Sequence, residues 1–199
     1  MRIYGDRRSG NCYKLVLLLH LLQREYEWTD VDIMKGETQN PAFLALSANG
    51  KIPIIELPDG RVLAESNAIL YFLDDKAIFT PASRYDFAKM LEWQNFEQYS
   101  HEPAIAVARF IKVYLGLPAS RRDEYEKKVA AGYRALEVME QHLTSHRFFV
   151  SDRPTLADIS LFAYTSVAHE GGFDLAAFPA VRHWLERISA LPGFVPLGH

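Results

Sequence analysis

Every segment of this chain with the character of a β-strand lies before Glu65, and this asymmetry limits the possible folds more than any other feature. Apolar or β-branched runs begin at Arg2, Trp28, Ile52 and Arg61, and the second run extends to Ile33. A stretch with helical spacing of leucines separates the first two runs. After this region the apolar residues recur at helical spacing, with no convincing strand. The chain is therefore predicted to combine a small α/β domain with an all-helical domain.

The order of elements in the first domain predicts a mixed sheet. A strand, a helix and a second strand at the start of the chain favour a parallel pair, because the helix returns the chain to the same end of the sheet. A short helix is expected at 41–46. Two extended runs, 52–57 and 61–64, are joined by a Pro-Asp-Gly sequence that forms tight turns, so they predict an antiparallel hairpin. A helix from Ser66 completes the order βαβαββα.

The remainder of the chain reads as a helix bundle. The boundary is predicted at 77–84, which leaves a first domain at 1–76, a linker, and an all-helical domain at 85–199. Gly- and Pro-containing breaks divide this second domain into long helical segments. Thr155 and Asp158 match a variant of the capping box at one helix start, with Asp in place of the usual Glu or Gln. Their role is interpreted as structural rather than catalytic.

Composition argues against several classes of function. The chain has 22 Lys and Arg and 25 Asp and Glu, a net charge of -3, so no basic surface for nucleic acid is indicated. The apolar run from Leu15 is too short to cross a membrane and follows charged residues, unlike a signal peptide. The single cysteine, Cys12, is typical of a reducing cytoplasm. His142 and His146 have the spacing of metal ligands but no third ligand nearby in sequence, so no metal is expected.

The loop Ser9-Gly10-Asn11-Cys12 has the outline of a Cys-x-x-Cys redox motif whose first cysteine is a serine. It joins a predicted strand to a predicted helix, and the free N–H groups and dipole of a helix start favour an anion. Ser9 can donate a hydrogen bond to such an anion, most usefully a thiolate, or it can simply cap the helix. Both interpretations stay open at this point. Cys12 is expected to be a buried apolar residue one turn into the helix.

Two further segments are suited to a peptide-like ligand. Pro53 opens an internal strand, where proline removes a ladder donor; a cis bond would leave the backbone of Ile52 free for a ligand strand, and a trans proline at an edge is the alternative. Glu65 and Ser66 stand before the next helix, where Ser66 would hold a carboxylate and Glu65 an ammonium group. Together they complement a free α-amino acid. The alternative for this pair is ordinary helix capping, with Glu65 a solvated charge.

Taken together, these segments resemble one known family. The chain is similar over its full length to the cytosolic glutathione transferases, on the motifs RRSGNCYK, NGKIPII, ESNAILYFL and RPTLADISLFAY in that order. The resemblance implies a thioredoxin-like first domain, an all-helical second domain and a homodimer. It also implies that Pro53 is cis, that Ile52 pairs with the cysteinyl unit of glutathione, and that Glu65 and Ser66 bind its γ-glutamyl end. Lys35 matches a lysine that contacts the ligand in bacterial beta-like members.

The resemblance implies a role for the loop that begins at Ser9, in which the first cysteine of a Cys-x-x-Cys motif is absent. Glutathione, as co-substrate, would supply the sulfur at this position. Beta-class members usually carry a cysteine in this loop, whereas zeta- and theta-like members use a serine, which matches Ser9. Nu-like members have a Thr-Pro-Asn loop in which the hydroxyl and the amide both address the thiol. Ser9 and Asn11 are therefore both candidates for stabilising the thiolate.

The activity implied is transfer of glutathione to a small apolar electrophile bound between the domains. A long helix containing Phe96, Tyr99, Ile105 and Arg109 is expected to supply the side chains that hold it. Two other interpretations remain open: a glutathione-dependent disulfide reductase, in which Asn11 has the larger role, and a glutathione-binding module without turnover.

Overall fold

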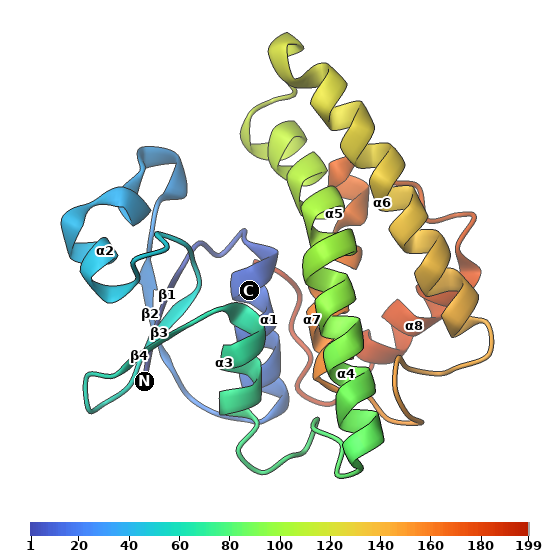
Figure 1. The fold of residues 1–199 in the computed structure, drawn as a ribbon, viewed down its shortest axis with the longest axis horizontal. Coiled ribbons are helices and arrows are strands. Elements are labelled where there is room, and N and C mark those ends of the chain that lie inside the picture. Colours follow the sequence, from blue (N-terminus) through green and yellow to red (C-terminus); the bar gives the residue numbers. More distant parts are fainter. Residues whose placement is uncertain (199) are drawn as a thin grey trace. The chain divides into compact units, whose positions relative to one another are not determined.

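The computed structural model describes residues 1–198, which divide into two compact units. Unit 1 contains Met1–Lys76 together with the end of the chain from Leu191, and unit 2 contains Ala77–Ala190. Among the described residues, strands occur only in unit 1, and unit 2 consists of helices and the loops that join them (Figure 1). This arrangement confirms the predicted fold class, an α/β domain followed by an all-helical one.

The sheet of unit 1 has four strands in the order β2-β1-β3-β4. These are β1 (Arg2–Gly5), β2 (Glu27–Asp30), β3 (Ile54–Glu56) and β4 (Val62–Ala64). β1 and β2 are parallel because helix α1 (Gly10–Leu21) connects them, whereas β3 runs antiparallel to both β1 and β4. The predicted parallel pair and hairpin are both present.

The second strand is shorter than its sequence pattern suggests. Its apolar character continues to Ile33, but the side chain of Asp32 accepts hydrogen bonds from the N–H groups of Met34 and Lys35. A short polar side chain of this kind offers the backbone an alternative to the ladder. The chain therefore turns into a 3-10 helix, η1 (Ile33–Lys35), followed by η2 (Glu37–Gln39) and α2 (Pro41–Leu46).

The core of unit 1 forms because α1 is apolar on almost every side. It packs against α3 (Ser66–Leu73), and the two helices lie side by side next to the sheet (Figure 1). A helix without a polar face is buried by its neighbours rather than left at the surface. The fully buried apolar residues of this core are Ile3, Cys12, Leu15, Leu17, Leu18, Leu19, Ile54, Ile55, Ile69, Leu70 and Leu73.

The end of the chain belongs to unit 1 rather than to the helical unit in which 85–199 was placed. The buried hydroxyl of Tyr13 on α1 donates a hydrogen bond to the carbonyl of Val195 at 2.7 Å. Gly193, at a φ of 86°, approaches His20 so closely that a Cβ atom would lie 2.7 Å from its carbonyl oxygen. Residues 77–84, expected as a linker, are grouped with unit 2.

Unit 2 is built from long helices around a central one. α4 (Arg84–Phe96), a π-helical turn η3 (Glu97–His101), α5 (Glu102–Arg109) and a second π-helical turn η4 (Phe110–Tyr114) follow without a break. A 3-10 turn η5 (Ala119–Arg121), α6 (Arg122–Leu143), α7 (Leu156–Thr165), a 3-10 turn η6 (Ala168–Gly171) and α8 (Pro179–Ser189) complete it. α7 is buried along its whole length and contacts α4, α5 and α8. Within residues 1–198, no helix is long and apolar enough to cross a membrane.

The start of α7 is held by the predicted capping box. The carboxylate of Asp158 accepts hydrogen bonds from the N–H of Thr155 at 2.7 Å and from its hydroxyl at 3.0 Å. Its other oxygen accepts from the N–H of Phe149 at 3.2 Å and from the indole of Trp184 at 3.0 Å. Burial raises the pKa of Asp158 to about 6, and these hydrogen bonds act in the opposite direction. One carboxylate thus joins three separate parts of unit 2.

We expect Asp158→Ala to destabilise unit 2 far more than removal of an exposed cap. The substitution leaves the donors of Thr155, Phe149 and Trp184 buried without an acceptor, and each such group costs about 1–3 kcal/mol. The matched control is Ser83→Ala, which removes the exposed cap of α4 and should cost about 1 kcal/mol. Urea unfolding of both variants measures the difference. Similar losses in the two would show that the buried network is not what holds this region.

Candidate functional site

The register of the sheet brings the predicted site segments to one end of unit 1. Tyr4 of β1 pairs with Ile54 of β3, and Ile54 pairs with Ala64 of β4, so these three residues form a row across the sheet. Just beyond this row the chain leaves β1 toward α1, enters β3, and leaves β4 toward α3. β2 also ends here because it is parallel to β1. Two helix starts and two loops therefore meet at this end.

Ser9 is the N-cap of α1. Its N–H donates to the carbonyl of Asp6 at 2.9 Å, and its hydroxyl oxygen accepts from the N–H of Cys12 at 3.4 Å. The capping interpretation is therefore present in the structure. It does not exclude the other one, because capping uses a lone pair of the hydroxyl and not its hydrogen. Asn11 lies half-buried in the first turn of the same helix.

The only cysteine of the chain is not placed for chemistry. Cys12 has no exposed surface, and its sulfur lies so close to Gly5 that a Cβ atom there would be 2.7 Å away. Burial raises the pKa of the Cys12 thiol to about 12, against a smaller lowering by the hydrogen bond with Ser9. The prediction of a buried, apolar role for Cys12 is confirmed.

The Ile52–Pro53 peptide bond is cis, as predicted. Pro53 is buried, and half-buried Ile52 packs against the apolar cluster formed by Val31, Phe43 and Ile54. Since β3 begins at Ile54, the backbone groups of Ile52 lie outside the strand ladder. This is the position from which they could pair with an extended ligand.

The start of α3 has an unusual backbone. Glu65 has a φ of 68°, in the left-handed region that non-glycine residues seldom adopt, and its exposed side chain makes no capping hydrogen bond. Such conformations cost of order 1–3 kcal/mol and cluster at ligand-binding sites. Ser66, the first residue of α3, is 6% exposed. An exposed Glu65 without a capping bond is what the capping alternative also expects, so the ligand interpretation of this pair stays a prediction.

Of two lysines in unit 1, the sequence analysis predicted a ligand contact for Lys35 and none for Lys14. Lys35 ends η1 after β2, with a side chain that is 76% exposed and forms an ion pair with Asp32 at 3.2 Å. Lys14 was not predicted, although its Nζ donates to the hydroxyl oxygen of Ser66 at 3.3 Å and its side chain is completely buried. The signal that could have found it is a single lysine inside the apolar run CYKLVLLL. A helix that is buried on nearly every side has no solvent face for such a residue.

The four side chains expected to hold an apolar substrate are not brought together. Phe96 and Tyr99 line a pocket of about 330 Å³ whose other lining residues come from Ser100 and α6. Ile105 is fully buried, and Arg109 is buried in an ion pair with Glu170 at 2.6 Å. The π-helical turn η3 changes the helical repeat after Phe96, so the spacing expected for one continuous α-helix does not hold.

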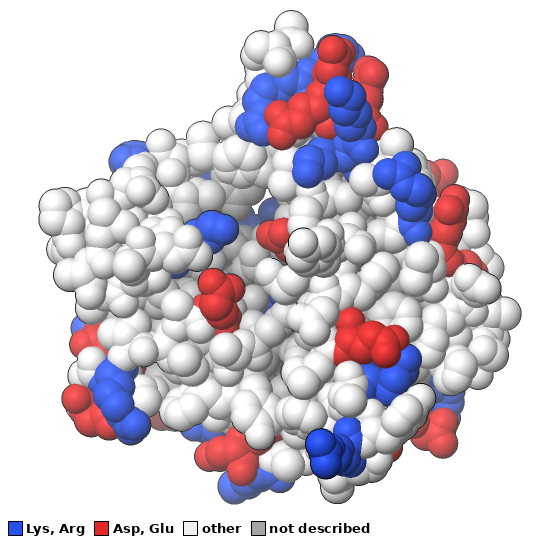
Figure 2. All heavy atoms as spheres, in the orientation of Figure 1, with Lys and Arg blue, Asp and Glu red and all other residues white. Residues whose placement is uncertain are grey.

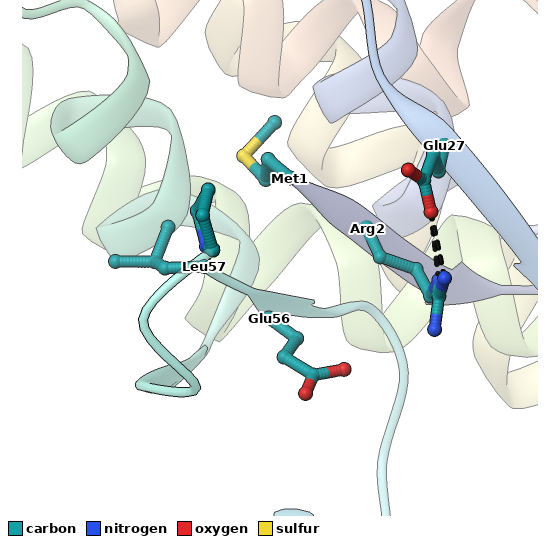
Figure 3. Close-up of a pocket in the computed structure, with 6 residues that line it drawn as sticks. Met1, Arg2, Glu27, Glu56 and Leu57 are labelled. Carbon is teal, nitrogen blue, oxygen red and sulfur yellow. Dashed lines mark hydrogen bonds and ion pairs between the residues drawn. The ribbon is translucent and has the colours of Figure 1, made fainter.

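A second pocket lies at the end of the sheet opposite to the predicted site residues. It has a volume of about 260 Å³ and surrounds the start of β1 (Figure 3). Two of its lining residues, Arg2 and Glu27, form an ion pair at 2.7 Å. A third, Glu56, accepts a hydrogen bond from Tyr4 at 2.6 Å. None of the predicted site residues lines this pocket.

Charges and histidines give no sign of another site. Basic and acidic side chains are interspersed on the face shown in Figure 2, and they gather near the start of α6, where Arg121 pairs with Glu124 at 2.7 Å. His142 and His146 stack on each other with ring centroids 4.2 Å apart, next to Trp93. Within the part of the chain that the structure describes, no group of three or more His, Cys, Asp or Glu residues could hold a metal ion.

Comparison with known families gives the same two-part division. Residues 8–76 match the model of the glutathione S-transferase N-terminal domain, and residues 95–192 match that of the C-terminal domain. A curated relative, glutathione S-transferase 3 of Zea mays, is 31% identical over 98% of this chain and 91% of its own length. Another, the disulfide-bond oxidoreductase YfcG of Escherichia coli, is 28% identical over 92% of this chain and 88% of its own.

Solved structures of glutathione S-transferases and of a related isomerase match this chain over nearly its full length. A glutathione S-transferase from Pseudomonas fluorescens is 54% identical, covers 98% of both chains and has a TM-score of 0.97. A maleylacetoacetate isomerase from Methylobacterium extorquens, solved with bound malonate and glutathione, is 26% identical over 97% of this chain and 94% of its own, with a TM-score of 0.82.

We expect the thiol of Cys12 to be unreactive in the folded protein. Because the thiolate is the nucleophile, a buried thiol with a raised pKa should react with an aromatic disulfide reagent at least about 100-fold more slowly than in urea. Release of the coloured thiol at pH ~8 measures both rates. Cys12→Ala gives the background, since the chain has one cysteine. Rapid labelling of the native protein would contradict the placement of this side chain.

Proposed function

Since this chain belongs to the cytosolic glutathione S-transferase superfamily, we propose that it binds glutathione at the sheet end of unit 1 and activates its thiol for transfer to a small apolar electrophile. The observation that carries this proposal is the position of Ser9. It caps α1 at the carboxyl end of β1, where helix N–H groups and the helix dipole favour an anion. Cys12 cannot supply that anion, so the sulfur comes from the ligand.

The glutathione would be held along its length by the segments that meet at this end. The backbone of Ile52, fixed by Pro53, would pair with the cysteinyl unit as an added strand does. The γ-glutamyl end has an ammonium and a carboxylate, which suit exposed Glu65 and the helix start at Ser66. Lys35 is the proposed contact for another part of the ligand. The related isomerase structure with bound glutathione supports glutathione as the ligand.

The chemical step follows from stabilisation of the charged sulfur. A hydrogen bond from Ser9 or Asn11 to the thiolate lowers the thiol pKa below about 8.5. The thiolate then attacks the electrophilic atom; the sulfur–electrophile bond forms as a leaving group departs or a double bond accepts the electron pair. The proton lost by the thiol passes to solvent. No metal takes part in this proposal.

The electrophile is proposed to bind to the helical unit, but through side chains other than the set first expected, since Ile105 and Arg109 are buried. A homodimer is part of the proposal on the basis of the family alone. A cytoplasmic location rests on the single, unpaired cysteine.

A glutathione-dependent disulfide reductase is the second candidate. The similarity to the disulfide-bond oxidoreductase of Escherichia coli favours it, as does the place of Asn11 in the first turn of α1. In that case the bound thiolate attacks a sulfur of a mixed disulfide, one disulfide forms, and the other sulfur leaves as a thiol.

Steady-state assays with a model aryl halide and with a mixed disulfide of glutathione should distinguish these functions. We expect turnover of the aryl halide in the presence of glutathione, with a much lower rate for the disulfide. The reverse ranking would favour the reductase. Glutathione binding by calorimetry without either reaction would support a binding module and overturn the catalytic proposal.

The thiol pKa of bound glutathione should decide between Ser9 and Asn11. If Ser9 is the main donor, Ser9→Ala raises this pKa toward the free value of about 8.5, and the rate at neutral pH falls as the thiolate fraction falls. Asn11→Ala should then have a smaller effect. Thiolate absorbance titrated against pH measures each value, with Cys12→Ala as the control that leaves it unchanged. Loss of activity in Cys12→Ala alone would contradict the role given to the ligand thiol.

A further inference from the structure

Lys14 is a buried basic residue that contacts the proposed glutathione site from inside the protein. Its side chain has no exposed surface, and it reaches from α1 to the first residue of α3. A buried ammonium group lowers stability unless hydrogen bonds compensate it. One of its hydrogen bonds is made to Ser66, a residue of the proposed site.

The hydrogen bond between Lys14 and Ser66 fixes the direction of the serine hydroxyl. A protonated lysine has three donors and no acceptor, so in the 3.3 Å contact the hydroxyl oxygen of Ser66 must be the acceptor. The hydroxyl hydrogen of Ser66 must then point away from Lys14. Ser66 is thereby prepared to donate, rather than accept, at the start of α3.

The positive charge of Lys14 also favours an anionic ligand group at the start of α3. The start of a helix presents free N–H groups and a partial positive charge to an anion. A lysine ammonium beneath that position adds a full positive charge, and because both side chains are buried its effect is screened less than that of a surface charge. Lys14 and α3 therefore favour a carboxylate at the same place.

We propose that Lys14 is a positioning residue for the α-carboxylate of the γ-glutamyl unit, acting through the hydroxyl of Ser66 without touching the ligand. This inference rests on the proposed glutathione site. In this proposal, the buried side chain of Lys14 is what gives the site its preference for a carboxylate. Exposed Glu65 supplies the complementary recognition of the ammonium group.

The test pairs a protein substitution with the removal of one ligand group. Glutathione is compared by calorimetry with γ-aminobutyryl-cysteinyl-glycine, which lacks only the α-carboxylate. Lys14→Met should weaken glutathione binding by about three- to tenfold, and Ser66→Ala by roughly tenfold or more. The analogue should bind Lys14→Met as well as it binds the wild type. The double variant should bind glutathione no more weakly than Ser66→Ala, because both act on the same hydrogen bond.

Lys14→Arg is the second variant, because it keeps a donor and a positive charge; it should retain more glutathione affinity than Lys14→Met. Urea unfolding shows which variants are folded. An equal loss for both ligands in Lys14→Met, or additive effects in the double variant, would overturn the positioning role. Failure of the wild type to bind glutathione would instead overturn the proposed function. Selective wild-type binding that Lys14→Met leaves unchanged would remove this inference alone.

Discussion

The pairing register of the two central strands is the constraint on which the candidate site depends. β1 and β3 are antiparallel, so the end of one strand lies beside the start of the other. This places the cis bond at Pro53 next to the loop that begins α1, and the hairpin brings the start of α3 to the same end. A shift by one residue would reverse the face of every side chain in the strand, and it would also break the hydrogen bond from Tyr4 to Glu56 between the two strands. The site is thus held by backbone hydrogen bonds and core packing rather than by its own residues.

Burial then determines which chemistry this end of the sheet can perform. The fold places Cys12 inside unit 1, where its thiol has no access and a raised pKa. The residues left at the surface of the loop are a hydroxyl and an amide, which stabilise an anion but do not replace a nucleophile. In the proposed function the thiol therefore comes from the ligand, which agrees with the superfamily to which the chain belongs.

The buried polar groups Asp158 of unit 2 and Lys14 of unit 1 have different roles. Asp158 accepts hydrogen bonds from four donors of its own unit, so all its bonding capacity is used within the fold. Lys14 instead directs a donor at Ser66, a residue at the start of a helix with strained backbone before it. The left-handed backbone at Glu65 and the buried lysine therefore lie at the same helix start, and sparsely populated backbone conformations cluster at ligand-binding sites.

The sequence by itself determined the order of elements, the two-part architecture and the capping box at Thr155 and Asp158. These depend on the period of apolar residues and on side chains that act within a few positions, so a local pattern contains the information. Its short contiguous motifs marked Ser9 as a candidate with two open roles, and the cis Ile52–Pro53 bond followed from the family resemblance that those motifs carry. The turn at Asp32 was not predicted, because the apolar run around it indicated a continuing strand. The hydrogen bond from the N–H of Met34 to the side chain of Asp32 ends the strand there instead.

Only the tertiary structure decided what lies beneath these motifs. Lys14 and Ser66 are far apart in sequence, and their contact exists because α1 and α3 pack together. The π-helical turn after Phe96 separated side chains that an α-helical period would have aligned, and it left Arg109 in a buried ion pair with Glu170. The end of the chain joined unit 1 through the hydroxyl of Tyr13. Each of these depends on contacts between distant segments, which no periodicity within one segment encodes.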